Sequence, residues 1–272
     1  FGQNYLAHFS PRYLFLTGAG HSQHSIPGFG QILVMWFPFS VLGIGVLLKK
    51  IIKKPWPMGL IFAQILISPV AASTTNNAIP HALRTFCSLP AWQILIALGL
   101  WQSWSWLKSK KARHVFLLGL FVLFFINFGF YFYNYHWFYP QECASDWQYG
   151  YKQAVDYVWE NKDTYDKVFF SRDYGEPYIF FLFHSQYDPF RYQNIDKKRV
   201  HRYNWVWVDQ FDKFYFPDFS DKGSSVQEIQ QQYQGKLLFV GLDEDIPNEW
   251  RLETVRFPNG RIAYEIGAVE GK

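Results

Sequence analysis

Long runs of apolar residues alternate with short polar stretches along the first half of the chain. Four apolar segments stand out, covering residues 32–48, 58–72, 91–107 and 115–133. Each holds about 15 to 19 residues, close to the ~20 that an α-helix needs to span a bilayer. Buried core helices are the alternative, but soluble domains rarely hold four such segments in series. The pattern therefore predicts an α-helical membrane region, residues 1–138, with four transmembrane helices and an interfacial loop at residues 1–30.

The pattern changes at about residue 139, where shorter apolar and polar stretches begin to alternate. Two capping boxes, Ser145 with Gln148 and Ser225 with Glu228, predict helices that run to Asn161 and to about Gln234. A further helix is predicted at 178–186, and strands are predicted at 167–171, 236–241, 251–257 and 261–268. An Asn-Gly pair predicts a tight turn between the last two strands. Residues 139–272 are therefore expected to form a small α/β domain with a mixed sheet.

Charge divides at the same place. No Asp or Glu precedes Glu142, so residues 1–139 carry 10 basic and no acidic side chains, and the remainder carries 16 basic and 22 acidic ones. The resulting charges of +10 and −6 add up to the +4 of the whole chain. Because the basic half is apolar and aromatic, no nucleic-acid partner is expected.

The basic residues of the membrane region predict its topology. They cluster at 49–54 and 108–113, after the first and third apolar segments, and positive loops stay in the cytoplasm. Residues 1–30, 73–90 and 139–272 are then extracytoplasmic, in a multi-pass protein of the cell (plasma or inner) membrane. The chain starts with Phe1 and carries no export signal, so we expect it to be the C-terminal part of a larger protein with further membrane helices.

Cysteines and histidines are the usual metal ligands, but their spacing here does not indicate a metal site. Cys87 and Cys143 both fall on the outer side, where a disulfide is one interpretation and two free thiols are the other. His8, His21 and His24 lie in the first loop at irregular spacing, with no carboxylate nearby. Neither a metal nor a resident cofactor is expected.

A candidate anion site precedes the third apolar segment. A helix is expected to begin near Pro80, where its free backbone N–H groups would favour an anion. Arg84 adds a planar donor fork suited to phosphate, and His81 and Asn77 add neutral donors. The expected ligand is the phosphate of a membrane lipid. In the alternative interpretation, Arg84 reaches the membrane interface and binds nothing specific.

A second candidate site follows the predicted strand 167–171. Loops at the carboxyl ends of strands are frequent binding loops in α/β proteins, so Tyr174 and Glu176 could contact an acceptor or glycan. An ordinary turn with Tyr174 packed inward is the alternative. The aromatic stretches 203–207 and 211–219 could stack on sugar rings, or they could simply form core.

Four stretches resemble a known family. They are HFSPRYLFLTGAGHSQHSIPGFG, SPVAASTTNNAIPHALRTFCSLP, DWQYGYKQAVDYV and YGEPYIFFLFHSQYDPFRYQ. Together they resemble the bacterial glycosyltransferase family 39, whose relatives are protein O-mannosyltransferases and aminoarabinose transferases. The resemblance implies a GT-C membrane fold, and transfer of a sugar from a polyprenyl-phosphate carrier to an extracytoplasmic protein, lipid or glycan acceptor.

The resemblance also implies site residues. His81, Arg84 and Asn77 would hold the donor phosphate, and His24, Tyr174 and Glu176 would contact substrate. The family's general base is an acidic residue of its first outer loop, and this chain has none before Glu142. We therefore expect the base to lie in a missing N-terminal part and the chain alone to be inactive.

Two other functions fit the same pattern. One is a ligase or oligosaccharyltransferase of the same membrane class, which moves a whole glycan. The other is a membrane-anchored, non-enzymatic glycan-binding or sensor module, although a simple anchor would need only one of the four spans.

Overall fold

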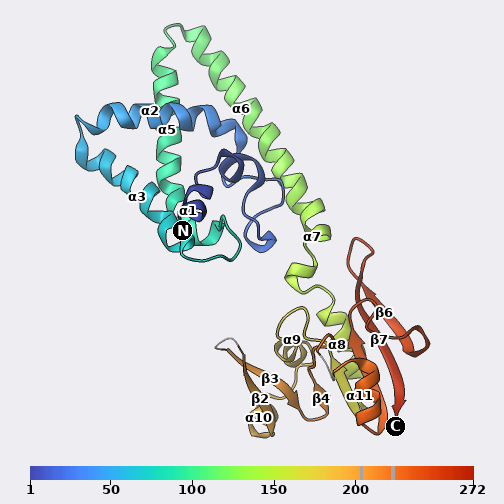
Figure 1. Cartoon of the computed structure of the whole chain (residues 1–272). Coiled ribbons are helices and arrows are strands. Elements are labelled where there is room, and N and C mark those ends of the chain that lie inside the picture. Colours follow the sequence, from blue (N-terminus) through green and yellow to red (C-terminus); the bar gives the residue numbers. More distant parts are fainter. Residues whose placement is uncertain (203–204, 222–223) are drawn as a thin grey trace. The chain divides into compact units, whose positions relative to one another are not determined.

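The computed structural model describes residues 1–202, 205–221 and 224–272 (Figure 1). The chain separates into two compact units, Phe1–Pro140 and Gln141–Lys272. The first unit contains α1 (Gly2–Ala7), α2 (Phe37–Ile51), α3 (Pro55–Ser73), α4 (Ala82–Thr85), α5 (Leu89–Trp106) and α6 (Lys110–Tyr133), and α7 (Tyr139–Glu142) leads into the second. Short 3-10 or π turns occupy Arg12–Thr17, Ser22–His24, Val34–Trp36, Phe86–Ser88 and Asn134–Phe138.

Four helical stretches are long and apolar enough to cross a membrane, which confirms the predicted helical region. They are Val34–Ile51, Pro55–Ser73, Ala82–Trp106 and Lys110–Glu142. Each contains most of one predicted segment. The fourth is longer than predicted because the basic residues before it and the aromatic residues after it are helical too.

Two glycines allow α2 and α5 to pack closely where α2 lies across α5 (Figure 1). A Cβ atom on Gly43 would lie 1.9 Å from the carbonyl oxygen of Leu95, and one on Gly99 would lie 1.9 Å from that of Phe39. Small residues let membrane helices approach at backbone distance in this way. The first loop joins the same core, because Tyr13, Leu14 and Phe15 are buried against residues of these helices. The loop is therefore folded into the core of the unit.

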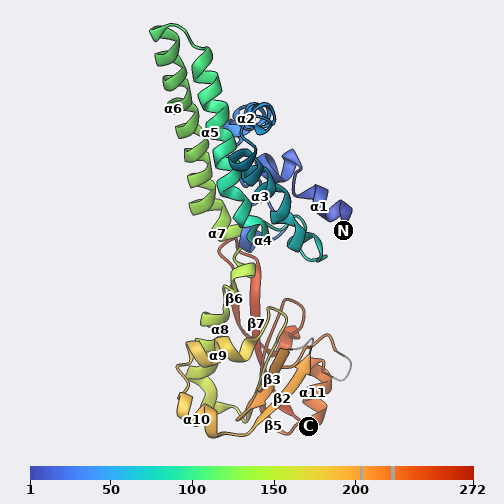
Figure 2. The same cartoon turned by 90° about the vertical axis from the view of Figure 1, so that its left-hand side faces the viewer.

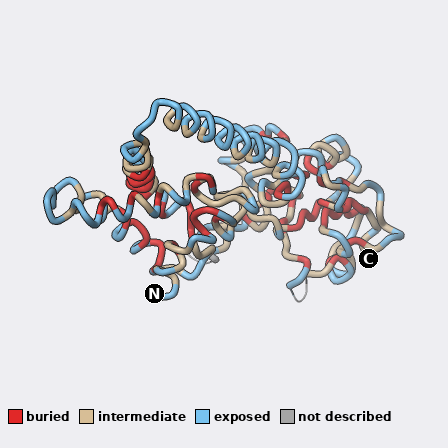
Figure 3. The backbone as a smooth tube through the Cα atoms, turned by 90° about the horizontal axis from the view of Figure 1, so that it is seen from above, coloured by how far each residue is buried: buried red, intermediate tan, exposed pale blue. Residues whose placement is uncertain are grey.

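α6 is apolar on all sides and, over its whole described length, buries none of its residues. Figure 3 shows it only in the colours of intermediate and exposed residues. A helix that is hydrophobic all round belongs in a protein core or a membrane. Its exposed surface is therefore one that lipid or other membrane helices can cover.

The second unit is built on a seven-stranded sheet of order β2-β3-β4-β1-β5-β7-β6. Its strands are β1 (Lys167–Phe170), β2 (Lys197–Arg202), β3 (Trp205–Phe211), β4 (Phe214–Tyr215), β5 (Gly235–Gly241), β6 (Arg251–Arg256) and β7 (Ile262–Gly271). β1 pairs in parallel with β4 and β5, and the other pairs are antiparallel. The predicted α/β domain with a mixed sheet is confirmed.

Helices cover both faces of this sheet, as Figure 2 shows. They are α8 (Tyr151–Asn161), α9 (Pro177–His184), α10 (Pro189–Asn194) and α11 (Val226–Gln232). Successive side chains of β1 point to opposite faces of the sheet, so they pack into two different hydrophobic cores. Phe170 packs with α8 and α9 residues such as Val155 and Phe181, whereas Phe169 packs with Val226 and Ile229 of α11.

The local predictions had mixed outcomes. The capping box at Ser225 is confirmed, because its hydroxyl accepts from the Glu228 N–H and the Glu228 carboxylate accepts from the Ser225 N–H. The one at Ser145 is wrong: residues Ser145–Trp147 form a 3-10 turn, and α8 begins only at Tyr151. Gln148, with a φ of +52°, ends this turn, and Gly150, with a φ of +104°, turns the chain again before α8 begins.

The remaining local predictions also had mixed outcomes. α9 ends at His184 and α11 at Gln232, two residues earlier than expected in each case. The hairpin of β6 and β7 is confirmed. The strands β2, β3 and β4 were not predicted. Cys87 and Cys143 are both free thiols, so the free-thiol interpretation is the correct one.

Candidate functional site

His81 begins the short helix α4, and its bonds define its protonation. Its backbone N–H donates to Nε2 of His8 over 3.0 Å, and its Nδ1 accepts from the Arg84 N–H over 3.3 Å. His8 Nδ1 lies 2.7 Å from the carbonyl oxygen of Asn4. Each imidazole thus accepts with one nitrogen, which places the proton of His8 on Nδ1 and that of His81 on Nε2. Two of the amides expected to face an anion are therefore used inside the protein.

Three imidazoles form a stack beside this helix. The His24 ring lies 4.7 Å from that of His21 and 4.8 Å from that of His81, measured between centroids. Nδ1 of His24 is buried and has no hydrogen-bond partner among the described residues. Burial, assisted by the charges of Arg84 and the neighbouring histidines, lowers the pKa of both His24 and His81. Both rings are therefore neutral donors at pH 7.

Arg84 completes a group that we call the histidine–arginine cluster: His8, His21, His24, His81 and Arg84. The Arg84 guanidinium is exposed and donates to Thr75 Oγ1 over 2.6 Å. Thr75 and the exposed Asn77 belong to the loop between α3 and α4. The structure therefore brings His24, His81 and Arg84 together, and it places Asn77 in the adjoining loop without a hydrogen bond among those described.

The histidine–arginine cluster and the basic loops lie at opposite ends of the helices that join them. α3 begins after the basic loop 49–54 and ends next to the cluster, whereas α5 begins next to the cluster and ends before the basic stretch 108–113. The cluster and the lysines thus lie at opposite ends of these two helices. Residues 1–141 contain no carboxylate side chain to neutralise either.

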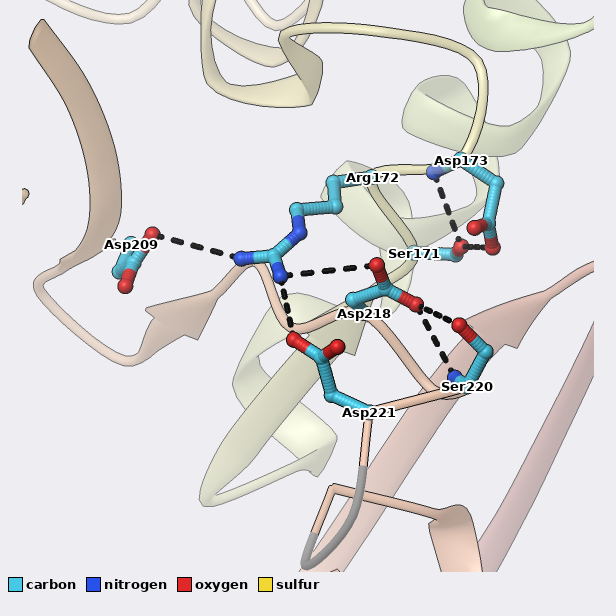
Figure 4. Close-up of polar contacts among 7 residues, drawn as sticks. All are labelled: Ser171, Arg172, Asp173, Asp209, Asp218, Ser220 and Asp221. Atoms are coloured by element: carbon cyan, nitrogen blue, oxygen red, sulfur yellow. Dashed lines mark hydrogen bonds and ion pairs between the residues drawn. The ribbon is translucent and has the colours of Figure 1, made fainter. Parts of the chain in front are cut away.

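The second unit holds a different charged site, at the carboxyl end of β1. Arg172 Nη2 lies 2.7 Å from Asp221 Oδ2 and 3.5 Å from Asp218 Oδ2, and its Nη1 lies 3.8 Å from Asp209 Oδ1. Figure 4 shows the guanidinium pointing into the space between these carboxylates. Ser171 bonds to Asp173 beside them. The Arg172 side chain is only 14% exposed, so these contacts are largely shielded from solvent.

The pKa values of two of these carboxyl groups shift in opposite directions. Burial raises the pKa of Asp209 against the opposing charges of Arg172 and Lys198. Burial acts in the same direction on Asp218, but hydrogen bonds from Ser220 and the Arg172 charge outweigh it and lower the pKa of that group. Asp218 therefore stays ionised beside the permanent Arg172 cation at neutral pH.

A pocket of about 170 Å³ opens beside Arg172. Its lining combines charged groups with aromatic rings, among them Lys198, Tyr215 and Tyr233. The sequence predicted a binding loop directly after strand 167–171, where Arg172 lies, but the aspartates were missed. They belong to β3 and to the loop after β4, which were not predicted. The recurrence of Asp at 209, 218 and 221 within an aromatic stretch was the signal that could have found them.

The two residues predicted to contact substrate in this domain lie elsewhere. The Tyr174 ring packs edge-on against Tyr264 and Phe257, with centroids 5.5 Å and 6.0 Å away, as the ordinary-turn interpretation describes. Glu176 immediately precedes α9 and interacts with Tyr178. Within the described residues, no group of three or more His, Cys, Asp or Glu side chains could hold a metal ion.

Comparison with known proteins gives no further guide. No family model, no curated protein and no solved structure matches the chain. The residues themselves must therefore support any functional proposal.

Proposed function

We propose that the chain is part of an integral-membrane glycosyltransferase that moves a sugar from a polyprenyl-phosphate carrier to an extracytoplasmic acceptor. The observation that supports this is the convergence of His24, His81 and Arg84. These donors meet in a unit that lacks carboxylates, next to the ends of helices that are long and apolar enough to span a membrane. Such a place favours an anion attached to a lipid.

Each residue has a role in the proposed step. The bond between the sugar's anomeric carbon and the carrier phosphate breaks, and its electron pair leaves with the phosphate. The acceptor oxygen forms the new bond to that carbon and gives up its proton to a base. Arg84 and the N–H groups of His24 and His81 stabilise the growing charge on the phosphate. No Asp or Glu within residues 1–141 can serve as the base, so these residues supply the donor side alone.

Lipid binding tests this proposal directly. The purified chain is placed in nanodiscs, and the affinity for undecaprenyl phosphate is measured against undecaprenol, which has the same chain but lacks the phosphate. Arg84→Ala should weaken phosphate-dependent binding by about tenfold or more, because charge-assisted hydrogen bonds contribute about 1.5–3 kcal/mol. Arg12→Ala removes another exposed arginine of the same unit and serves as the matched control.

Transfer activity provides the second test, in the protein expressed from its whole reading frame. Removing one donor to a developing anion costs about 10²–10³ in rate, and Arg84→Ala should show a loss of that order. Unchanged lipid binding and unchanged transfer in Arg84→Ala would rule out the proposed role.

A further inference from the structure

The Arg172 pocket continues onto one face of the β2–β3 hairpin. Lys198 lines the pocket, and alternate residues of a strand share a face, so Val200 lies on the same side. Val200 pairs with Trp207 across the hairpin, and cross-strand partners share a face as well. Trp207 therefore lies on the face of the hairpin that leads into the pocket. Trp205, two residues earlier in the same strand, lies on this face as well.

An irregularity in β3 brings Asp209 to this face as well. Arg199 pairs with Val208 and Lys198 pairs with Gln210, which leaves Asp209 as an extra residue in a β-bulge. Val208 is buried in the core on the opposite face, whereas Asp209 reaches Arg172. Bulges commonly redirect one side chain next to a binding site.

The aromatic side chains of this face are not fully used by the fold. Trp205 is 68% exposed, which is a large apolar area to leave in water. The indole Nε1 of Trp207 is buried and has no hydrogen-bond partner among the described residues. Buried indole N–H groups normally find a partner, and the described residues leave this one without any.

The polar groups of the pocket restrict the chemistry of its ligand. Arg172 and Lys198 are donors, and Asp209, Asp218 and Asp221 are acceptors, which together carry a net charge of −1. A phosphate or carboxylate would meet three carboxylates and be repelled. A neutral polyol can donate to carboxylates and accept from the cations with neighbouring hydroxyls, while its apolar C–H face stacks on an aromatic ring.

We propose that the Arg172 pocket, with Trp205 and Trp207 beside it, is a saccharide-binding site of the second unit. The ligand class is a neutral sugar with free adjacent hydroxyls. The site needs neither a carrier lipid nor the histidine–arginine cluster. It therefore goes beyond the proposed sugar transfer, and the two proposals can be tested independently.

The experiment uses the full 272-residue chain in nanodiscs, because detergents with sugar headgroups would compete. Saturation-transfer NMR and titration are run with methyl glycosides of glucose, galactose, mannose and N-acetylglucosamine. At least one should bind saturably. Asp221→Asn and Trp205→Ala alter side chains that are 59% and 68% exposed, and each should weaken that binding by about tenfold or more.

Matched controls lie outside the pocket. Asp156→Asn removes the exposed carboxylate that pairs with Lys152 on α8, and Phe190→Ala removes a ring that is 75% exposed on α10. Both should bind the sugar like the unaltered chain. Failure of every glycoside to bind, equal loss in the controls, or binding of Ca²⁺ or spermidine in place of sugar would each overturn the assignment. Sugar binding is measured without any lipid carrier, so a failed transfer assay does not affect it.

Discussion

The imidazoles of His24 and His81 stack 4.8 Å apart although they come from different loops of the first unit. Both rings are held neutral, because burial and the nearby Arg84 charge lower their pKa. His8, which accepts from the His81 amide, has a pKa lowered chiefly by burial. The first loop is thus fastened to the loop before α4 by groups that must stay unprotonated.

This arrangement makes the membrane unit sensitive to acid. Unfolding returns each histidine to its ordinary pKa of about 6.5, so below that pH the unfolded chain binds more protons than the folded one. Stability should therefore fall as the pH drops below about 6.5 and continue to fall until the folded pKa values are passed. Thermal unfolding followed by circular dichroism at pH 7.5 and pH 5 measures the difference.

Replacing the His24 imidazole by a ring that cannot be protonated should reduce the loss of stability at low pH. His24→Phe keeps the stack and removes the buried Nδ1, so its stability should depend less on pH than that of the unaltered chain. His114→Phe, at an exposed position on α6, is the control and should leave the dependence as it was. Identical pH dependence in all three proteins would contradict the role given to the stack.

The close crossing of α2 and α5 gives a second prediction. Gly43→Ala would place a Cβ atom 1.9 Å from the Leu95 carbonyl oxygen, and the helices would have to separate. Overpacking of this kind costs about 1–3 kcal/mol, so the thermal midpoint in detergent should fall. Gly45→Ala lies on the same helix with nothing within 4 Å, and it should be neutral or slightly stabilising. A midpoint equally low in both variants would point to α2 itself rather than to the crossing.

Sequence patterns best predicted the structural features that depend on residues close together in the chain. The four apolar segments needed only length and composition, and the Ser225 capping box needed only three residues. The box at Ser145 failed because two positive-φ residues, Gln148 and Gly150, turn the chain before α8 begins. β2 was missed because its charged residues, Lys197, Lys198 and Arg199, do not show the alternation of a half-buried strand.

The candidate sites were only half predictable for a related reason. Arg84 and His81 stand at the start of a predicted helix, so they could be identified from the sequence, and the predicted binding loop begins at Arg172. Their partners come from distant segments: His24 joins His81 through the folding of the first loop, and Asp209 reaches Arg172 through a bulge. Neither contact leaves a local pattern in the sequence.

A buried ion pair in the second unit gives a third prediction. Arg251 Nη1 lies 2.7 Å from Oε1 of Glu265, whose side chain is 0% exposed. Burial raises the pKa of Glu265, and the Arg251 charge opposes that shift. Arg251→Ala would leave a buried carboxylate unpaired, which costs about 3–5 kcal/mol.

The pH dependence of that variant distinguishes charge from packing. A carboxyl group with a raised folded pKa contributes stability at low pH and loses it as the pH rises through that pKa. The deficit of Arg251→Ala should therefore be larger at pH 7 than at pH 5, as judged by chemical denaturation. Arg256→Ala removes a neighbouring arginine whose side chain bonds only to the Gly260 carbonyl among the contacts described, and its smaller deficit should not depend on pH. A deficit of Arg251→Ala that is the same at both pH values would assign its effect to lost packing.

The predicted topology can be tested with single cysteines. Cys87→Ser and Cys143→Ser remove the two native free thiols, and one new cysteine is then placed at Asn77 or at Ser109. Asn77 lies in the exposed loop beside the histidine–arginine cluster, whereas Ser109 lies among the basic residues between α5 and α6. Because positive loops stay in the cytoplasm, a membrane-impermeant maleimide should label Asn77→Cys in intact cells and label Ser109→Cys only after permeabilisation. The reverse pattern would place the cluster in the cytoplasm and remove the basis for an extracytoplasmic transfer reaction.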